Sequence, residues 1–116
     1  MLLPSHTRVY LGLGNTDMRK SINTLSVLVE GAMELDPFSG HLFGFCNRRR
    51  NIVKILYWDR NGFCLWQKRL EKDKFHWPES REEVLEIDQR QLNWLLEGLT
   101  VHQPMRYKEL KYSITA

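Results

Sequence analysis

The stretch from Asp36 to Leu70 most constrains the fold of this chain, because turn signals and strand patterns alternate there without a break. It begins with Asp36-Pro37-Phe38-Ser39-Gly40, in which proline presets a turn angle and glycine can adopt a positive φ. Three runs rich in β-branched and aromatic residues follow: His41 to Asn47, Ile52 to Trp58 and Phe63 to Leu70. The stretch therefore predicts a β-meander of three antiparallel strands.

The connection between the last two strands permits two registers. A two-residue loop at Asn61-Gly62 would place Lys54 opposite Arg69, and like charges directly opposite each other destabilise a sheet. A four-residue loop instead pairs Leu56 with Leu65. We predict the second register.

The residues before this stretch predict a further strand and a long helix. Arg8 to Leu13 alternates between two faces with the period of a half-buried strand. Thr16 or Asp17 can cap a helix that ends before Pro37, because proline interrupts helical geometry. Its apolar stripe extends over about four turns. The stripe consists of Met18, Ile22, Leu25, Val29 and Ala32.

The residues after the meander predict a short strand at Val84 to Ile87 and a second helix. Asp88 and Gln91 have the spacing of a capping box, and leucines recur with helical spacing from Leu92 to Leu99. Gly98 lies near the predicted helix end, and residues 100–116 form a polar tail.

These elements predict an α+β fold. The 116 residues, of which 42% are apolar and 27% charged, suit a single domain spanning 1–116. We expect an antiparallel β-meander of about four or five strands, with one long N-terminal helix packed on it and a second helix near the C-terminus.

The sequence favours a cytoplasmic protein. Polar residues break the first apolar run within a few positions of Met1, and no segment has the length needed to cross a bilayer. Cys46 and Cys64 lie in different predicted strands, and we interpret them as reduced core thiols. The histidines lack metal-ligand spacing, so neither a metal site nor a cofactor is predicted.

Positive charge is concentrated between Arg48 and Lys74, where nine basic residues face three acidic ones. This segment carries +6, whereas the rest of the chain carries −3. Such an asymmetry favours a polyanion such as nucleic acid. The alternative is a solvated turn whose charges prevent edge pairing. The predicted nucleic-acid-binding residues are Arg48, Arg49, Arg50, Lys54, Lys68, Arg69, Lys72 and Lys74.

Four further residues are candidates for additional contacts. Arg19 and Lys20 could extend the basic surface from the first helical turn, where Asp17 could also pair with an arginine of the hairpin. Phe75 and Trp77 lie outside the predicted strands and could stack on exposed bases, although aromatic residues more often belong to a core.

A catalytic interpretation would require clustered carboxylates, as in metal-dependent nucleases. Asp17, Asp36 and Asp59 are the candidates, but each has a local explanation as a helix cap, a turn residue or a hairpin residue. We therefore predict a protein that is not an enzyme.

The order of the motifs resembles the accessory proteins, TnpB-type products of the second open reading frame, of bacterial insertion sequences of the IS-sixty-six family. The similarity covers about residues 9–99 and rests on Thr16-Asp17-Met18-Arg19-Lys20, Asp36-Pro37-Phe38-Ser39-Gly40, Asn47-Arg48-Arg49-Arg50, Leu56-Tyr57-Trp58-Asp59, Gly62-Phe63, Lys68-Arg69-Leu70, Phe75, Trp77-Pro78 and Leu95-Leu96-Glu97-Gly98-Leu99. It implies a non-catalytic role in DNA transposition beside a separate DDE-type transposase encoded by the same element, with DNA at the transposon ends as a partner.

Two other functions remain open at this point. A protein adapter would bind the transposase without intrinsic DNA binding, and a nuclease would cleave DNA with a metal. The acidic segment 79–88 and the Leu92–Leu99 helix could form the adapter's interface, or could be a solvated face and a core helix. The sequence leaves the number of copies open.

Overall fold

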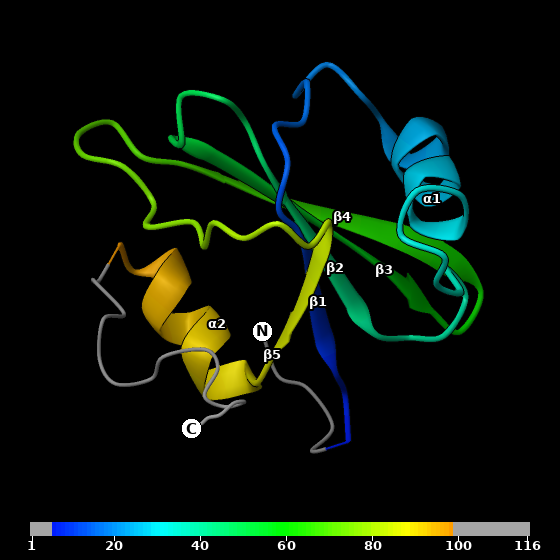
Figure 1. Cartoon of the computed structure of the whole chain (residues 1–116). Helices are drawn as coiled ribbons and strands as arrows, with labels where there is room; N and C mark the ends of the chain where they lie inside the picture. The colour runs from blue at the N-terminus through cyan, green and yellow to red at the C-terminus, as the bar shows by residue number, and fades with distance from the viewer. Residues whose placement is uncertain (1–5, 99–116) are drawn as a thin grey trace.

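The computed structural model describes residues 6–98 and shows one five-stranded sheet with a helix on each face (Figure 1). The strand order is β4-β3-β2-β1-β5. The elements are β1 (Val9–Gly12), α1 (Ile22–Glu30), β2 (Leu42–Cys46), β3 (Ile52–Asp59), β4 (Gly62–Arg69), β5 (Val84–Ile87) and α2 (Gln89–Leu96). The predicted α+β class and all five predicted strands are confirmed.

The sheet is mixed, which corrects the expectation of a wholly antiparallel one. β2, β3 and β4 form the predicted antiparallel meander, but β1 runs parallel to β2. The reason is α1, which crosses over the sheet between β1 and β2 and lets the second strand run in the direction of the first. β5 then pairs antiparallel with the outer side of β1.

The register of the β3–β4 hairpin is the one predicted from charge. Leu56 faces Leu65, and Lys54 faces Gln67 rather than Arg69. The predicted four-residue loop is wrong, however, because pairing continues to Asp59 and Gly62 and leaves only residues 60–61 in the loop.

α1 is short, which corrects the prediction of a long helix starting at Thr16 or Asp17. It begins at Ile22 after the N-cap residue Ser21. The Lys54 ammonium accounts for the late start, because it bonds the carbonyl oxygens of Met18 and Lys20. In a longer helix those oxygens would accept bonds from the backbone four residues later.

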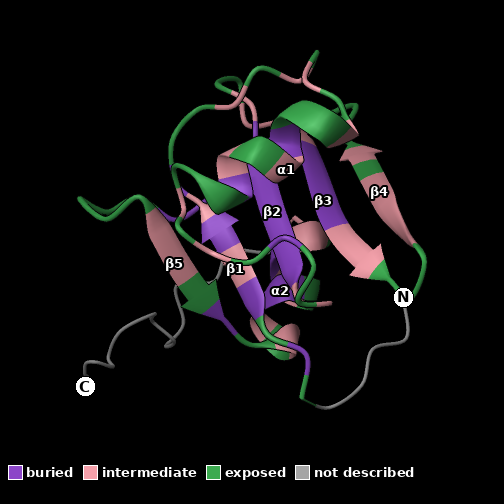
Figure 2. Ribbon diagram, turned by 90° about the vertical axis from the view of Figure 1, so that its right-hand side faces the viewer, coloured by how far each residue is buried: buried purple, intermediate pink, exposed green. Residues whose placement is uncertain are grey.

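Two apolar clusters fix the helices on opposite sides of the sheet (Figure 2). One cluster contains α1 residues and the sheet residues beneath them: Leu25, Val29, Phe43, Phe45 and Leu56. The other contains α2 residues and most of the remaining core: Val9, Leu11, Leu13, Leu42, Cys46, Val53, Ile55, Phe75, Trp77, Ile87, Leu92 and Leu95.

The start of α2 is the predicted capping box. The Asp88 carboxylate accepts from the Gln91 N–H at 2.7 Å, and the Gln91 side chain accepts from the Asp88 N–H at 2.9 Å. Gly98 has φ of +77° just after the helix, where the lack of a Cβ permits that conformation. Leu99 and the predicted tail 100–116 lie outside the described residues.

Candidate nucleic-acid interface

The turn between β2 and β3, residues 47–51, presents the arginine run and is organised by Asn47. The Asn47 side-chain oxygen accepts from the N–H groups of Asn51 and Ile52 at 3.0 and 3.1 Å. Its amide nitrogen donates to the Asn51 side chain at 2.8 Å. Asparagine is suited to such turn-closing bonds. The turn therefore holds Arg48 and Arg49 at an ordered, exposed tip.

Residues 71–75, which follow β4, pack beside this turn. Phe75 donates its N–H to the Arg50 carbonyl at 2.7 Å, and Leu70 donates its N–H to the Asn51 carbonyl at 2.8 Å. Arg49, Lys72 and Lys74 consequently line one depression of about 320 Å³. The fold thus brings together cations that lie more than twenty positions apart in the sequence.

We use the name basic end for Arg48, Arg49, Lys72 and Lys74. All four side chains are exposed, and within residues 6–98 none of them forms an ion pair. Nearby Arg69 is also exposed, but its guanidinium bonds Glu71 at 3.0 Å. The turn, the adjoining segment and the last residue of β4 together carry six cations against the carboxylates of Glu71 and Asp73, so positive charge dominates there. The six cations are Arg48, Arg49, Arg50, Arg69, Lys72 and Lys74.

Arg50 has a structural role within the same turn. Its φ is +62°, a conformation that is uncommon for a residue with a side chain. One guanidinium nitrogen donates to the Asn47 carbonyl at 3.3 Å. Burial raises the pKa of the Cys46 thiol, and Arg50 partly offsets that effect. Arg50 therefore mainly stabilises the turn that presents Arg48 and Arg49.

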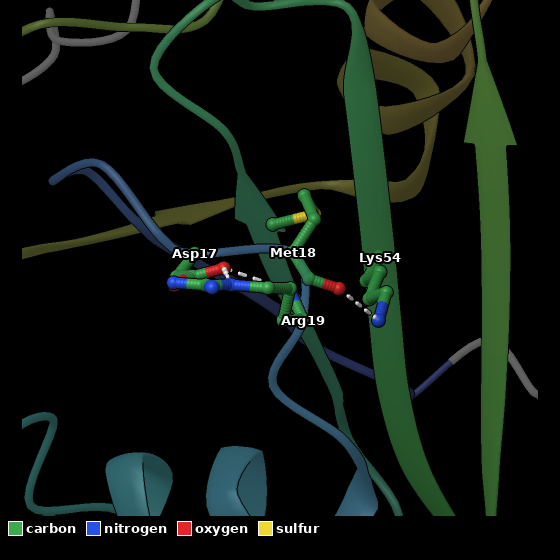
Figure 3. A network of polar contacts seen from close by, with 4 residues as sticks. All are labelled: Asp17, Met18, Arg19 and Lys54. Carbon is green, nitrogen blue, oxygen red and sulfur yellow. Dashed lines mark hydrogen bonds and ion pairs between the residues drawn. The ribbon is translucent and has the colours of Figure 1, made fainter.

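Lys54 departs from the predicted binding set because it is buried in the sheet. Only 9% of the residue is exposed. Its ammonium donates to the carbonyl oxygens of Met18 at 2.7 Å and Lys20 at 2.9 Å, and Figure 3 shows the first of these bonds. Lys54 therefore holds the segment before α1 against β3 and is not available to a phosphate in this conformation.

Lys68 is also engaged inside the fold. Its ammonium donates to the Leu96 carbonyl at 2.7 Å, at the C-terminal end of α2. Carbonyl groups at that end of a helix lack intrahelical donors and carry partial negative charge, so a cation is favourable there. Lys68 therefore ties α2 to β4 instead of adding to the basic end.

Phe75 and Trp77 correct the stacking hypothesis, because both are buried. Their exposed fractions are 2% and 6%, and both belong to the apolar cluster beneath α2. The Trp77 indole donates to the Gly12 carbonyl at 3.0 Å. These rings anchor the segment after β4 to the sheet, so neither presents a face to a base.

Arg19 and Lys20 lie in the segment before α1, at the same end of the sheet as the basic turn, because Thr16 donates its N–H to the Cys46 carbonyl. The Arg19 guanidinium bonds the Asp17 carboxylate at 2.6 Å (Figure 3), so Asp17 pairs within its own segment and not with the hairpin. The side-chain bond from Arg19, followed by the bond from its backbone N–H, holds the pKa of the Asp17 carboxyl well below its usual range.

The three candidate catalytic carboxylates are engaged separately. Asp17 bonds Arg19, Asp36 accepts from the Phe38 N–H at 2.9 Å, and Asp59 lies beside Arg60 at 3.9 Å in the hairpin. Across residues 6–98 no group of three histidine, cysteine or acidic side chains is placed to hold a metal ion.

The two candidate adapter surfaces differ in accessibility. The acidic segment exposes Glu79, Glu82, Glu83 and Glu86, and the last lies 4.0 Å from Arg8. In α2, by contrast, Leu92 and Leu95 are buried against the sheet, as a core helix requires.

Asn47 and Lys54 support the candidate interface and the segment before α1, and the sequence alone did not predict these structural roles. Asparagine at the start of a predicted turn was a usable signal for Asn47. Lys54 is the third residue of the Ile52–Asp59 strand and stands between the apolar residues Val53 and Ile55, which indicated a covered position, but its carbonyl partners lie over thirty residues away.

These features define a small α+β domain with a mixed sheet and one exposed cationic end. The chain belongs to the family of IS66 Orf2 like proteins, whose model matches residues 7–106. This family gives the protein an accessory role in the transposition of an insertion sequence.

Two proteins of Sinorhizobium fredii strain NGR234 are similar over most of their length. The one named uncharacterized protein y4hO is 35% identical over 105 residues, which cover 89% of this chain and 91% of that protein. Uncharacterized protein y4jC is 32% identical over 100 residues, which cover 85% and 86%. No solved structure matches the chain significantly. None of the helices in residues 6–98 has the length and apolarity to cross a membrane.

Proposed function

We propose that the protein assists transposition by binding DNA at the transposon ends through its basic end, while a separate DDE-type transposase performs the strand chemistry. The observation that carries this proposal is the convergence of Arg48, Arg49, Lys72 and Lys74 around one turn, exposed and without ion pairs among the described residues. Unpaired cations that converge on one surface are suited to a phosphate backbone.

The ordered turn strengthens this argument. Asn47 already closes the turn, so a bound phosphate need not order its backbone. A guanidinium can bond two phosphate oxygens at once, which suits Arg48 and Arg49 at the tip. The lysines are point charges that add affinity with less geometric demand.

The proposed contacts are to the backbone and not to base edges. Phe75, whose N–H bonds Arg50 beside the turn, and Trp77 are both buried, so neither offers a platform for base stacking. We therefore expect modest sequence preference from this protein alone and a strong dependence on salt. If the four cations each neutralise one phosphate of duplex DNA, the logarithm of affinity should fall against the logarithm of salt concentration with a slope of about −3 to −4.

A titration of fluorescent duplexes tests the proposal without the transposase. The duplexes carry the terminal inverted repeat of the element or a scrambled sequence, at two salt concentrations. The test variant is R48A/R49A, and the matched control R60A/R90A removes the same charge from exposed positions in the β3–β4 hairpin and at the start of α2, at the other end of the sheet. We expect the test variant to bind at least about tenfold more weakly at low salt and the control to bind nearly as the wild type.

A second candidate, a protein adapter for the transposase, is favoured by the exposed glutamates of segment 79–88. Such an acidic face can contact a basic surface on a partner. The absence of DNA binding at low salt would overturn our first proposal and favour the adapter. An equal loss of affinity in the two double variants would show that net charge matters and the basic end does not.

A further inference from the structure

We propose that two copies of this chain associate edge to edge through β4, in antiparallel orientation, so that their sheets join into one. Among the described residues, β4 pairs only with β3 and forms one border of the sheet (Figure 2). A border strand presents a row of N–H and C=O groups that can pair with another strand.

The free backbone groups on β4 can be assigned from the hydrogen-bond pattern. Leu70 donates its N–H to Asn51, which extends the β3–β4 ladder by one pair. In antiparallel strands, hydrogen-bonded and non-bonded pairs alternate. Even-numbered residues of β4 therefore bond β3, and odd-numbered residues direct their N–H and C=O groups outward. The outward-directed residues are Phe63, Leu65, Gln67 and Arg69.

β4 has few of the features that usually protect an edge, since its charged residues, Lys68 and Arg69, lie only at one end. It is eight residues long, contains no proline and pairs with β3 in a continuous register without a bulge. Its residues 63–66, Phe63-Cys64-Leu65-Trp66, are apolar and only half-buried. The other border strand, β5, is protected by comparison: it has four residues, and its exposed Glu86 lies near Arg8.

The charge pattern of β4 favours a second copy as its partner. All the charge on β4 lies at one end, at Lys68 and Arg69. Antiparallel self-pairing centred on Trp66 sets Arg69 six positions along the strand from Arg69 of the partner subunit, and Lys68 four positions from Lys68 of the partner subunit. Pairing centred on Trp66 places Phe63 opposite Arg69 of the partner subunit and Leu65 opposite Gln67 of the partner subunit. Every outward-directed pair then exchanges hydrogen bonds, and no like charges lie opposite each other.

This arrangement also has a consequence for the basic end. Each copy's basic end adjoins the charged end of β4, so pairing would place the two basic ends at opposite ends of the joined sheet. Eight residues at about 3.3 Å each set them at least about 25 Å apart. The inference does not depend on DNA binding and is tested without DNA.

Sedimentation velocity of the full chain over a range of concentrations provides the first test. We expect the mass to rise from 13.9 kDa toward twice that value with concentration. Gln67→Pro removes an outward N–H and no bond to β3, and proline is tolerated at such edge positions. We expect it to weaken association at least about tenfold, whereas the control Gln67→Thr, which keeps the N–H, should not.

Amide exchange of the wild type provides a second test that does not require the proline variant to fold. Backbone N–H groups of residues 63, 65, 67 and 69 should gain protection as concentration rises, while residues 64 and 66 should be protected at every concentration. A chain that stays monomeric to millimolar concentration would overturn the proposal. So would dimerisation without this alternation, or protection of all four amides that is independent of concentration, which would mean that the edge is covered within one chain.

Discussion

Lys54 and Lys68 lie inside the fold, whereas the four cations of the basic end are exposed. Both groups come from residues 48–74, but their roles differ. Lys54 and Lys68 each place an ammonium on backbone carbonyls that another element leaves without donors. The basic end places its charge in solvent with no such acceptors among the described residues. The charges of Lys54 and Lys68 therefore stabilise the fold, whereas the charges of the basic end are available to a partner.

Strand alternation explains the division. Lys54 points to the α1 face and Lys68 to the α2 face, so each reaches the backbone of a segment packed on its side of the sheet. The side chains of the basic end lie outside the strands, and no helix or segment among the described residues packs over them with carbonyl acceptors. The comparison predicts large stability effects from the first group and binding effects from the second.

Lys54→Met should have the largest effect, because it removes a charged donor and leaves the Met18 and Lys20 carbonyls without it. Hydrogen bonds to charged groups contribute roughly 1.5–3 kcal/mol each, so we expect a loss of about 2–4 kcal/mol in the free energy of unfolding. Urea denaturation measures this loss. The control, Lys72→Met at the basic end, should change stability by less than about 0.5 kcal/mol. Similar values for the two variants would remove the distinction between the groups.

The double variant Arg48→Ala with Arg49→Ala should change DNA binding and leave stability almost unchanged, the opposite of Lys54→Met. Stability should stay within about 0.5 kcal/mol of the wild type, since both side chains are exposed at the tip. If DNA binding occurs as proposed, the salt slope should become less steep by about two. Fluorescence titrations at several salt concentrations, with urea denaturation of the same protein, check both parts. A folded variant with an unchanged slope would contradict the assignment of the tip to DNA.

Asn47→Ala should distinguish the contribution of the ordered turn to DNA binding from the contribution of its arginine charges. The change removes the turn-closing bonds but leaves every cation in place. We expect a loss of about 1–3 kcal/mol in stability and a weaker affinity for DNA at an unchanged salt slope. Affinity equal to that of the wild type would mean that an ordered turn is not needed for binding.

Local patterns predicted much of this fold, and long-range contacts account for most of the errors. The strands, the β3–β4 register and the Asp88–Gln91 capping box follow from alternation, charge and spacing of nearby residues. The late start of α1 does not, because its cause is a lysine 34 to 36 residues away. The parallel β1–β2 pairing depends in the same way on how the connection through α1 crosses the sheet.

The candidate site shows the same limit. The sequence showed where positive charge is concentrated, but it could not show which of the cations face solvent. The approach of residues 71–75 to the β2–β3 turn depends on the Phe75–Arg50 backbone bond and on burial of the Phe75 ring. Neither contact has a local signal, since Phe75 lies 25 positions from Arg50 in the sequence.

Lys68→Met should have a smaller effect than Lys54→Met, because the Lys68 ammonium donates to one carbonyl oxygen and the Lys54 ammonium donates to two. We expect a loss of about 1–2 kcal/mol, from the hydrogen bond and the attraction to the helix end. Thermal unfolding measures the loss, and amide exchange in α2 locates it. A loss spread evenly over α1 and α2 would argue against the proposed tie between β4 and α2.

The pair Asp17–Arg19 should have the smallest effect, since both side chains are largely exposed. The pKa of Asp17 in the folded protein lies below its ordinary value of 3.8, so the pair favours folding at pH values above 3.8. That contribution is lost as the pH falls from 3.8 through the lower value of the folded state. Arg19→Ala should raise the pKa of Asp17 toward 3.8, as measured by carboxyl NMR titration, and should weaken this acid dependence, since the backbone N–H of residue 19 remains. An unchanged titration would show that the backbone N–H, and not the guanidinium, dominates the carboxylate's environment.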